Sequence, residues 1–358
     1  MSTPRVTVLM SVHNGGRWLR AAIESVLAQS WRDFEFLILD DASTDDSVAQ
    51  IEALADTRIR LIRLPENIGL TRSLNVGLRE ARGEFVARQD ADDLSSPERL
   101  AAQVAFLERH PDVPLAGTQA RLIDAEGRSR GVRDLPCEAD SIRWLSLLDN
   151  PIIHTSAMFR AAVIRDEFGG YDESFSCCQD YDLWTRVLLR HPAQNLSERL
   201  VSVREHGGSI SATRSDEARP LVRRVVRRLA DAWLPAITLD DAAIDLLCAF
   251  RRHLAPEEVA PFRELLARCD AEFASHFPDA AASEDLALTG AGVFARIGYN
   301  LLTKDRTLAL RQFAAAVRAS SAMLARIPWP RVVALLIFGD RVRAWAGRER
   351  GTDLQSVR

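Results

Sequence analysis

Short apolar runs alternate with amphipathic stretches over the first hundred residues of the chain. The apolar runs are rich in valine, leucine, isoleucine and phenylalanine, as expected for strands that are covered on both faces. They predict strands at 6–10, 34–39, 59–64 and 85–87. Between them, apolar residues recur at helical spacing and predict helices at 17–27, 48–54 and 70–81. We expect Ser43 or Thr44 to cap the second of these helices.

This alternation predicts the fold class. A β-α-β-α-β-α-β order at this spacing implies a mostly parallel sheet flanked by helices, and therefore an α/β fold. Beyond residue 97 the pattern is less regular. It predicts helices at 97–110, 141–148 and 179–189, and strands at 115–123, 156–159 and 201–206.

The character of the chain changes near residue 216, where it becomes helical and rich in Ala, Leu and Arg. One face of the first such helix is apolar. The other face is basic, and we expect it to be solvated; it carries Arg223, Arg224, Arg227 and Arg228. Residues 280–284 have the composition of a linker. We therefore predict an α/β domain over 1–212 and a helical region over 213–358.

Composition narrows the class of protein. The 358 residues are 47% hydrophobic and 27% charged, as in an ordinary globular protein. A net charge of −4 argues against a dedicated nucleic-acid binder. The five cysteines form no Cys-x-x-Cys pair, and no apolar segment near Met1 has the form of a signal peptide. We expect a cytoplasmic protein without disulfides.

The C-terminal segment is basic, with eleven Lys or Arg against four Asp or Glu over 304–358. Its apolar run at 332–338 is far shorter than the roughly twenty residues that span a bilayer. With Trp329, Trp345 and the arginines around them, the segment could lie on the inner face of an anionic membrane as a peripheral contact. A helical cap on the α/β domain is the alternative.

Acidic residues follow two of the predicted strands. Asp40 and Asp41 end one strand, and Asp90, Asp92 and Asp93 end another. In an open α/β sheet, ligands bind beyond the carboxyl ends of the strands. Carboxylates gathered there suit a divalent cation that holds a phosphate-bearing substrate. One acidic turn is easily explained as a helix cap, but two such strand ends favour a functional site.

Two further candidates are ambiguous from local sequence. Asp180 opens a predicted helix, where the helix dipole alone favours a carboxylate, so a helix-capping role is the simplest interpretation. His206 could be a core histidine, a ligand or a surface residue. The chain has neither a Gly-x-Gly-x-x-Gly nor a Gly-x-x-x-x-Gly-Lys-Ser/Thr motif, which argues against an NAD enzyme and a P-loop NTPase.

Eight ordered motifs over about residues 4–212 resemble the family 2 glycosyltransferases. The first four lie at 6–14, 40–45, 66–70 and 83–93, and the others at 150–154, 169–172, 179–184 and 204–206. Their order and spacing are similar to those of the family, which is far more specific than a single Asp-x-Asp. The remaining C-terminal residues carry no such motif.

The resemblance implies a GT-A fold and transfer of a sugar from a nucleotide-activated donor, usually with inversion and with Mn²⁺ or Mg²⁺. Asp180 resembles the catalytic base of the family. Asp92 resembles the metal ligand, and His206 the histidine that reaches the metal or the diphosphate. The residues that resemble the nucleotide-sugar site are Ser11, Asn14, Asp40, Asp41, Asn67, Arg72 and Asp90. We expect a UDP-sugar donor and a glycan or lipid-linked acceptor.

The sequence departs from the family pattern at two places. Gln179 stands where a glutamate usually precedes the base, and Ser11-Val12-His13 replaces a common Pro-Thr-Tyr. The first departure keeps open a non-catalytic protein that binds a nucleotide-sugar or a glycan. A nucleotidyltransferase is a second alternative. Such an enzyme normally has a glycine- and arginine-rich phosphate-binding loop near its N-terminus, and Gly15-Gly16-Arg17 matches that loop poorly. A membrane-surface scaffold built on the basic C-terminus is a third.

Overall fold

The computed structural model describes residues 3–208, 215–249, 254–302, 304–327 and 332. The chain divides into two compact units, one of residues 1–128 and 152–221, the other of residues 129–151 and 222–358. Residues 129–151 thus belong to the same unit as the C-terminal helices, although they lie inside the predicted domain 1–212. The domain boundary at 212/213 itself stays a prediction.

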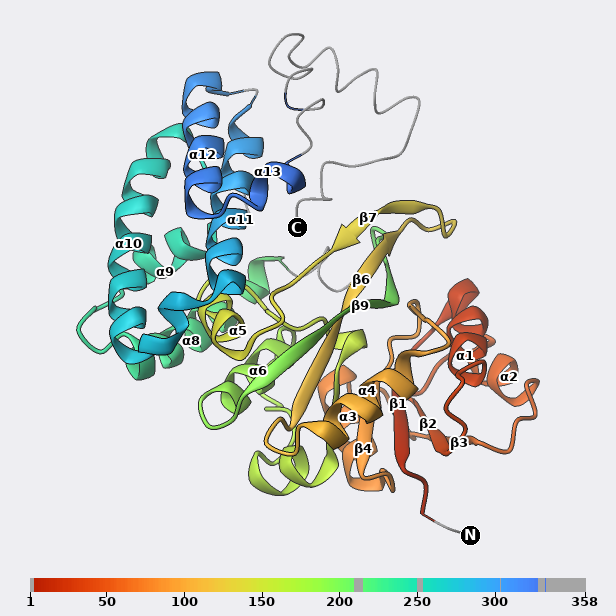
Figure 1. Ribbon diagram of the computed structural model, residues 1–358. Coiled ribbons are helices and arrows are strands. Elements are labelled where there is room, and N and C mark those ends of the chain that lie inside the picture. The colour runs from red at the N-terminus through yellow and green to blue at the C-terminus, as the bar shows by residue number, and fades with distance from the viewer. Residues whose placement is uncertain (1–2, 209–214, 250–253, 303, 328–331, 333–358) are drawn as a thin grey trace. The chain divides into compact units, whose positions relative to one another are not determined.

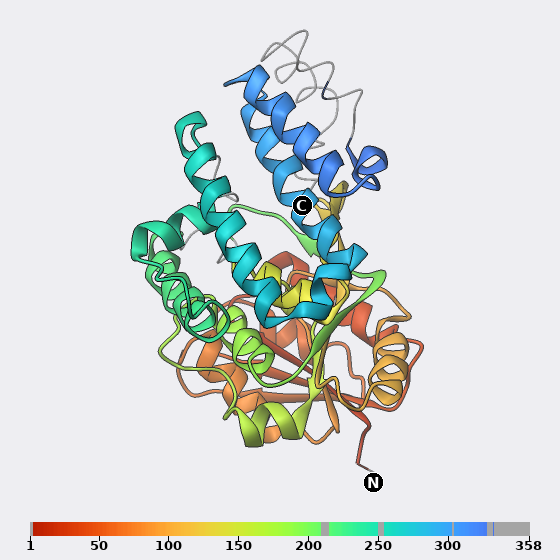
Figure 2. The same ribbon diagram turned by 60° about the vertical axis from the view of Figure 1, so that its left-hand side comes forward.

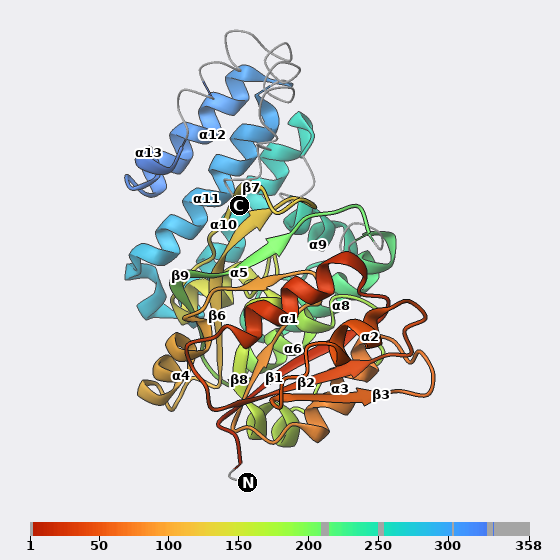
Figure 3. The same cartoon turned by 90° about the vertical axis from the view of Figure 1, so that its right-hand side faces the viewer.

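The parallel half of the sheet in the first unit is built from four strands, which Figure 3 draws in red and orange. β1 (Val6–Val12) lies between β2 (Phe34–Asp40) and β4 (Phe85–Arg88) and runs parallel to both. β3 (Ile59–Arg63) extends the sheet parallel to β2. All residues of β1, β2 and β4 are buried, which explains why their sequences read as continuous apolar runs.

The sheet continues beyond β4 through strands of both directions (Figure 1). β8 (Met158–Arg160) is antiparallel to β4 and to β6 (Leu115–Ile123). β9 (Ala193–Arg204) runs parallel to β6, and the short β5 (Leu94–Ser95) pairs antiparallel with β9. The order is β3-β2-β1-β4-β8-β6-β9-β5, a mixed α/β sheet in which parallel pairs predominate. The predicted fold class is confirmed.

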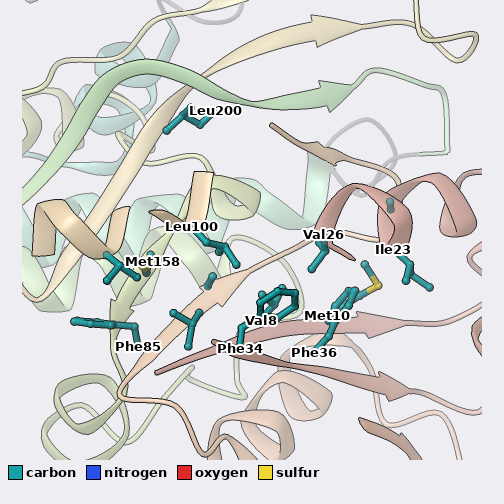
Figure 4. Close-up of a cluster of buried hydrophobic side chains, with 14 of the residues drawn as sticks. Val8, Met10, Ile23, Val26, Phe34, Phe36, Phe85, Leu100, Met158 and Leu200 are labelled. Carbon is teal, nitrogen blue, oxygen red and sulfur yellow. The ribbon is translucent and has the colours of Figure 1, made fainter. Parts of the chain in front are cut away.

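Helices cover this sheet because their apolar stripes match its two faces. On one face, Val8 and Met10 of β1 pack in a cluster with Ile23 and Val26 of α1 (Leu19–Leu27), together with Leu100 of α4 (Arg99–Arg109) (Figure 4). Each of these side chains is almost fully buried. Burial of one such side chain stabilises the fold by about 1.5–3 kcal/mol.

On the other face, α3 (Leu70–Glu80) approaches the sheet closely because of Gly77. A Cβ atom at Gly77 would lie 2.3 Å from Leu9 Cδ1 and 2.9 Å from Leu39 Cδ2, both on the sheet. The absence of a side chain therefore sets the distance between the helix and the sheet. This matters for the site, since α3 carries Arg72.

The predicted elements of the first hundred residues are all present, with shifts of one or two residues at their ends. The predicted cap of the second helix is wrong. α2 (Ser47–Glu52) begins after Asp46, and no side chain caps it. Ser43 and Thr44 instead bond to Asn14: the Asn14 N–H donates to Ser43 Oγ at 3.0 Å, and the Thr44 N–H donates to Asn14 Oδ1 at 2.8 Å.

The second unit is mainly helical. It contains α5 (Ala139–Ser146), most of α8 (Ser215–Trp233), and the helices that follow it in the chain. These are α9 (Asp241–Cys248), α10 (Val259–His276), α11 (Glu284–Leu301), α12 (Arg306–Ala319) and α13 (Met323–Arg326). The second unit also includes β7 (Ser129–Arg133). α11 and α12 run side by side (Figure 2).

Hydrogen bonds tie the segment 129–151 to the later helices within this unit. The backbone N–H groups of Cys137 and Glu138 both donate to Asp285 Oδ2, at 3.1 and 3.0 Å. Trp144 Nε1 donates to Asp270 Oδ1 at 2.7 Å. α5 also packs against α11. The second unit is therefore assembled from two segments of the chain.

Two sequence predictions in the second unit are corrected. The basic face of α8 is paired in part: Arg223 bonds to both carboxylate oxygens of Asp245, at 2.8 and 2.6 Å, and Arg227 pairs with Asp241. The predicted linker 280–284 is also wrong, because a 3₁₀ helix (Pro278–Ala282) leads directly into α11.

Most of the basic C-terminal segment lies outside the described residues, including Trp329, Trp345 and nearly all of the apolar run 332–338. Among the helices that the structure describes, none combines the length and the apolar character needed to span a membrane.

Candidate active site

The two acidic strand ends lie at the same edge of the sheet. β2 and β4 flank β1 and run parallel to it, so their carboxyl ends meet on either side of the end of β1. Asp40 and Asp41 at the end of β2 are only 3% and 2% exposed. After β4, the side chains of Asp90 and Asp92 are 28% and 33% exposed. The edge therefore offers accessible carboxylates beside buried ones.

Asp41 shapes the loop before α3. Its two carboxylate oxygens accept the N–H groups of Ile68 at 2.8 Å and Gly69 at 2.9 Å. Asn67 Oδ1 accepts the same Gly69 N–H at 3.1 Å. Gly69 has φ of +85°, a conformation that favours glycine. Asp41 and Asn67 thus hold the turn that starts α3, which projects the exposed Arg72 with its Nε 3.5 Å from a Glu173 carboxylate oxygen.

Ser11 and Asn14 lie at the carboxyl end of β1. Ser11 Oγ donates to Ser73 Oγ of α3 at 2.8 Å. Asn14 has φ of +53°, and its side-chain oxygen accepts the N–H groups of Thr44 and Asp45 at 2.8 and 3.3 Å. Asp40 Oδ1 accepts the Ser43 N–H at 3.2 Å. These contacts fix the loop after β2 against the end of β1.

Asp92 and His206 meet although they are more than a hundred residues apart in the chain. His206 Nε2 lies 2.9 Å from Asp92 Oδ2, and the Trp18 ring lies against the imidazole with ring centroids 4.3 Å apart. Burial, and after it the charge of Asp90, raises the pKa of the Asp92 carboxyl. Burial also raises the pKa of Asp93 well above its usual range.

Arg204 connects this cluster to β9. Its backbone N–H donates to Asp93 Oδ1 at 2.8 Å, and its Nε donates to the Asp92 carbonyl at 2.9 Å. The guanidinium also lies over the Trp18 ring, 5.5 Å from its centroid. Arg204 therefore holds the acidic turn in place and sets the position of His206 two residues later.

Asp180 lies in the first turn of α6 (Gln179–Leu188) but does not cap it. The N-cap is Cys178, with φ of +58°, so Asp180 is the second residue of the helix. Its side chain is half-buried. Its charge acts to raise the pKa of both His154 and Tyr171, so the carboxylate lies within electrostatic range of these two rings. Gln179 beside it is 6% exposed.

A divalent cation fits part of this site. Among the described residues, no three Asp, Glu, His or Cys side chains are gathered as a complete metal site. Mg²⁺ in phosphate-transferring sites is commonly held by one or two protein ligands together with substrate phosphates. Asp92 and His206, already in contact beside two further carboxylates, match such an incomplete ligand set.

The fold is that of the GT-A glycosyltransferases. The crystal structure of S. aureus TarS 1–349 in complex with UDP-GlcNAc is similar to this chain with a TM-score of 0.55. The likeness covers 89% of this chain and 92% of that one at 17% sequence identity, so it concerns the fold alone.

Sequence comparison identifies the family. The model of glycosyl transferase family 2 matches residues 7–168. The putative glycosyltransferase EpsE of Bacillus subtilis (strain 168) is 38% identical over 237 residues, which cover 64% of this chain and 84% of EpsE. The amylovoran biosynthesis glycosyltransferase AmsE of Erwinia amylovora is 30% identical over 213 residues, 58% of this chain and 79% of AmsE. The chain belongs to the family 2 glycosyltransferases and is a glycosyltransferase enzyme.

Sequence reasoning assigned no role to several residues that build the site. Arg88 is the clearest case: it is fully buried at the end of β4, and its guanidinium pairs with Asp90 Oδ1 at 2.6 Å. Thr155 accepts the Asp90 N–H at 3.1 Å, and Arg204 holds the acidic turn as described above. An arginine directly after an apolar strand was the available signal for Arg88. Thr155 gave no signal, since its contact depends on the pairing of β4 with β8.

Proposed function

We propose that the protein transfers a sugar from a UDP-sugar to a hydroxyl group of a glycan or lipid-linked acceptor, with inversion at the anomeric carbon. The contact of Asp92 with His206 at 2.9 Å, beside Asp90 at the end of β4, carries this proposal. It supports a site for a diphosphate rather than a pair of unrelated helix caps. The name of AmsE, an amylovoran biosynthesis enzyme, supports a glycan as acceptor.

On the donor side, the nucleotide would lie over the carboxyl ends of β1 and β2. Asp40 or Asp41 would accept a hydrogen bond from the base, and Asp90 would contact the ribose. Ser11, Asn14 and Asn67 order the surrounding loops. Arg72 is exposed and could turn from Glu173 to a phosphate.

Asp92 and His206 would hold Mn²⁺ or Mg²⁺. When bound, the cation supplies positive charge against the negative charge of the leaving diphosphate. Cation binding would replace the hydrogen bond between these two side chains. His206 Nε2, which now contacts Asp92, is the nitrogen that faces the acidic turn and would become the ligand.

Asp180 would act as the general base. An alcohol is a weak nucleophile at neutral pH, so a positioned carboxylate must accept its proton as the new bond forms. The acceptor oxygen bonds to the anomeric carbon, the bond from that carbon to the diphosphate oxygen breaks, and the proton passes to Asp180. Inversion requires the base on the face of the sugar opposite the leaving group. The placement of Asp180 on α6, apart from the acidic turn after β4, is compatible with this requirement.

The first experiment is calorimetric binding of UDP and of GDP, with and without Mn²⁺. We expect the wild type to bind UDP in a Mn²⁺-dependent manner. Asp92→Ala should lose this dependence, whereas Asp112→Ala, an exposed carboxylate that follows α4, should keep it.

Three results would count against the proposal. A preference for GDP would mean that the donor is not a UDP-sugar. Equal binding with and without Mn²⁺ would mean that Asp92 does not hold a metal for nucleotide binding. If neither nucleotide bound, the donor and its site would both be wrong, although family membership would stand.

A further inference from the structure

Arg88 is a buried cation whose position depends on its neighbours. Its side chain is 0% exposed, and its guanidinium donates to the Leu9 carbonyl at 3.2 Å and to the Gln89 carbonyl. A second terminal nitrogen donates to Asp90 Oδ1 at 2.6 Å. A buried guanidinium is tolerated only when it is paired and its N–H groups are bonded. Since Arg88 does not reach solvent, it would act on a substrate through its partners, of which Asp90 is 28% exposed.

The remaining guanidinium nitrogen determines the state of His154. Arg88 Nε lies 3.2 Å from His154 Nε2. Arginine has donors and no acceptor, so His154 Nε2 must be the acceptor and must carry no proton. The neutral ring therefore carries its proton on Nδ1. Tyr171 Oη, 3.1 Å from the same Nε2, then donates its hydroxyl proton to it.

The charged and titratable groups around His154 favour this neutral state. Burial, and after it the charge of Arg88, lowers the pKa of His154, whereas Asp90 and Asp180 act weakly in the opposite direction. Burial raises the pKa of Tyr171, so its hydroxyl remains a donor. An imidazolium at this position would point an N–H at the N–H of Arg88.

Tyr171 is itself held in place from α3. Its backbone N–H donates to Asn75 Oδ1 at 2.9 Å, and its carbonyl accepts from Asn75 Nδ2 at 2.9 Å. The chain of contacts from Asp90 through Arg88 and His154 to Tyr171 therefore ends on a fixed loop near Asp180.

We propose that Arg88 and His154 are positioning residues of the donor site. Neutral His154 accepts a hydrogen bond from Arg88, and Arg88 holds the Asp90 carboxylate in the orientation that receives the nucleotide. Loss of the acceptor at His154, or its protonation, frees Arg88 to turn away from Asp90. The effect on nucleotide binding rests on the proposed function, whereas the state of His154 does not.

The first test is the ¹⁵N spectrum of the full chain labelled at histidine. The shifts of the two ring nitrogens distinguish a protonated from an unprotonated nitrogen, and the signal missing from His154→Gln assigns His154. We expect Nδ1–H with a bare Nε2 at neutral pH, and protonation at lower pH than for a histidine in an unfolded chain. A protonated Nε2 at neutral pH would overturn the proposal without reference to any substrate.

The second test is calorimetric binding of UDP with Mn²⁺ to two variants of His154. In His154→Gln, the amide oxygen can replace Nε2 as acceptor, so UDP affinity should stay within about threefold of the wild type. His154→Leu has no acceptor and should bind UDP about tenfold more weakly or worse. A merely structural role would leave both folded variants with the wild-type affinity.

The dependence of UDP affinity on pH distinguishes a positioning role of His154 from a merely structural one. Wild-type affinity for UDP should fall more steeply on acidification than that of His154→Gln, because only the wild type loses an acceptor there; parallel profiles would overturn the proposal. If His154→Leu does not fold, the ¹⁵N spectrum and the pH dependence of UDP affinity in His154→Gln still test the proposal. If the wild type does not bind UDP at all, the donor assignment fails, and the spectrum alone decides whether His154 accepts from Arg88.

Discussion

At the scale of single residues, two carboxylates in the first turn of α6 have opposite environments. Asp182 is 0% exposed and pairs with Arg186 at 2.8 Å, while Arg186 also donates to the carbonyls of Phe168 and Gly170. Asp180 is half-buried and near the rings of His154 and Tyr171. Asp182 therefore stabilises the fold, whereas Asp180 remains partly accessible to a substrate.

This difference leads to the first prediction. Asp180→Asn removes the proton acceptor while keeping the shape of the side chain, so we expect kcat for transfer to fall by at least about a hundredfold. Binding of UDP with Mn²⁺, measured by calorimetry, should stay within about twofold, because the base does not contact the nucleotide.

Asp182→Asn is the matched control. It breaks a buried ion pair and should lower the free energy of unfolding by about 3 kcal/mol, measured in urea. If Asp180→Asn lost stability like the control and kept its transfer rate, Asp180 would be a structural residue and not the base.

The lowered pKa of His154 makes stability depend on pH. Because the histidine protonates at about pH 6.5 in the unfolded chain and only at lower pH in the folded one, the unfolded state binds the proton first on acidification. The free energy of unfolding should therefore fall as pH drops below about 6.5, and His154 should contribute nothing to its pH dependence above about 7.5.

Urea unfolding of the wild type and His154→Gln over about pH 5–8 tests this prediction. The difference in unfolding free energy between the two proteins should be constant at the alkaline end and should shift against the wild type at the acid end. A constant difference over the whole range would show that His154 protonates equally in both states.

At the scale of elements, the distance between α3 and the sheet depends on one glycine. Gly77→Ala would place a methyl group 2.3 Å from Leu9 Cδ1, in a core without room for it. We expect the free energy of unfolding to fall by about 1–3 kcal/mol, measured in urea. UDP affinity should fall with it, because α3 carries Arg72 and Ser73.

Gly290→Ala in α11 is the control, since a Cβ atom there has no neighbour within 4 Å. In a helix with free space, alanine should stabilise by about 0.5–1 kcal/mol. Equal effects of the two substitutions would mean that the contact between α3 and the sheet does not depend on Gly77.

Most elements were predictable because their signal is local. The apolar runs of β1 and β2 indicated strands covered on both faces, and the structure buries every residue of both. The Asp90 turn was also predictable, since strand ends in such sheets meet at one edge. By contrast, Arg223 was taken as solvated because its partners, Asp241 and Asp245, lie on another helix. The role of Arg88 was missed for the same reason: its contact with His154 joins residues far apart in the sequence.

At the scale of the whole molecule, the two compact units are not two consecutive pieces of chain. α5 and its flanking residues come from the first half of the sequence but belong to the second unit, where α5 packs against α11. Ile142, Trp144 and Leu147 are 0%, 4% and 2% exposed. The hydrogen bonds from Cys137 and Glu138 to Asp285 belong to the same unit. Nothing in the local sequence of 129–151 indicates this, because its partners begin more than a hundred residues later.

The last prediction concerns a chain cut at the boundary 212/213. If residues 1–212 formed a self-sufficient domain, the fragment should be monomeric and should bind no more of the dye ANS than the full chain. We expect the opposite: the fragment retains 129–151 but lacks α11, against which α5 packs, and Asp270, the partner of Trp144, so it should expose apolar surface, bind ANS and associate. Light scattering measures association, and ANS fluorescence measures dye binding.

Replacing Ile142 and Leu147 with serine in the fragment should reduce both association and dye binding. The same replacements in the full chain should lower its stability by several kcal/mol, since they place polar groups in a core. A fragment that stays monomeric without these replacements would contradict the grouping of 129–151 with the C-terminal helices and would favour the domain boundary predicted from the sequence.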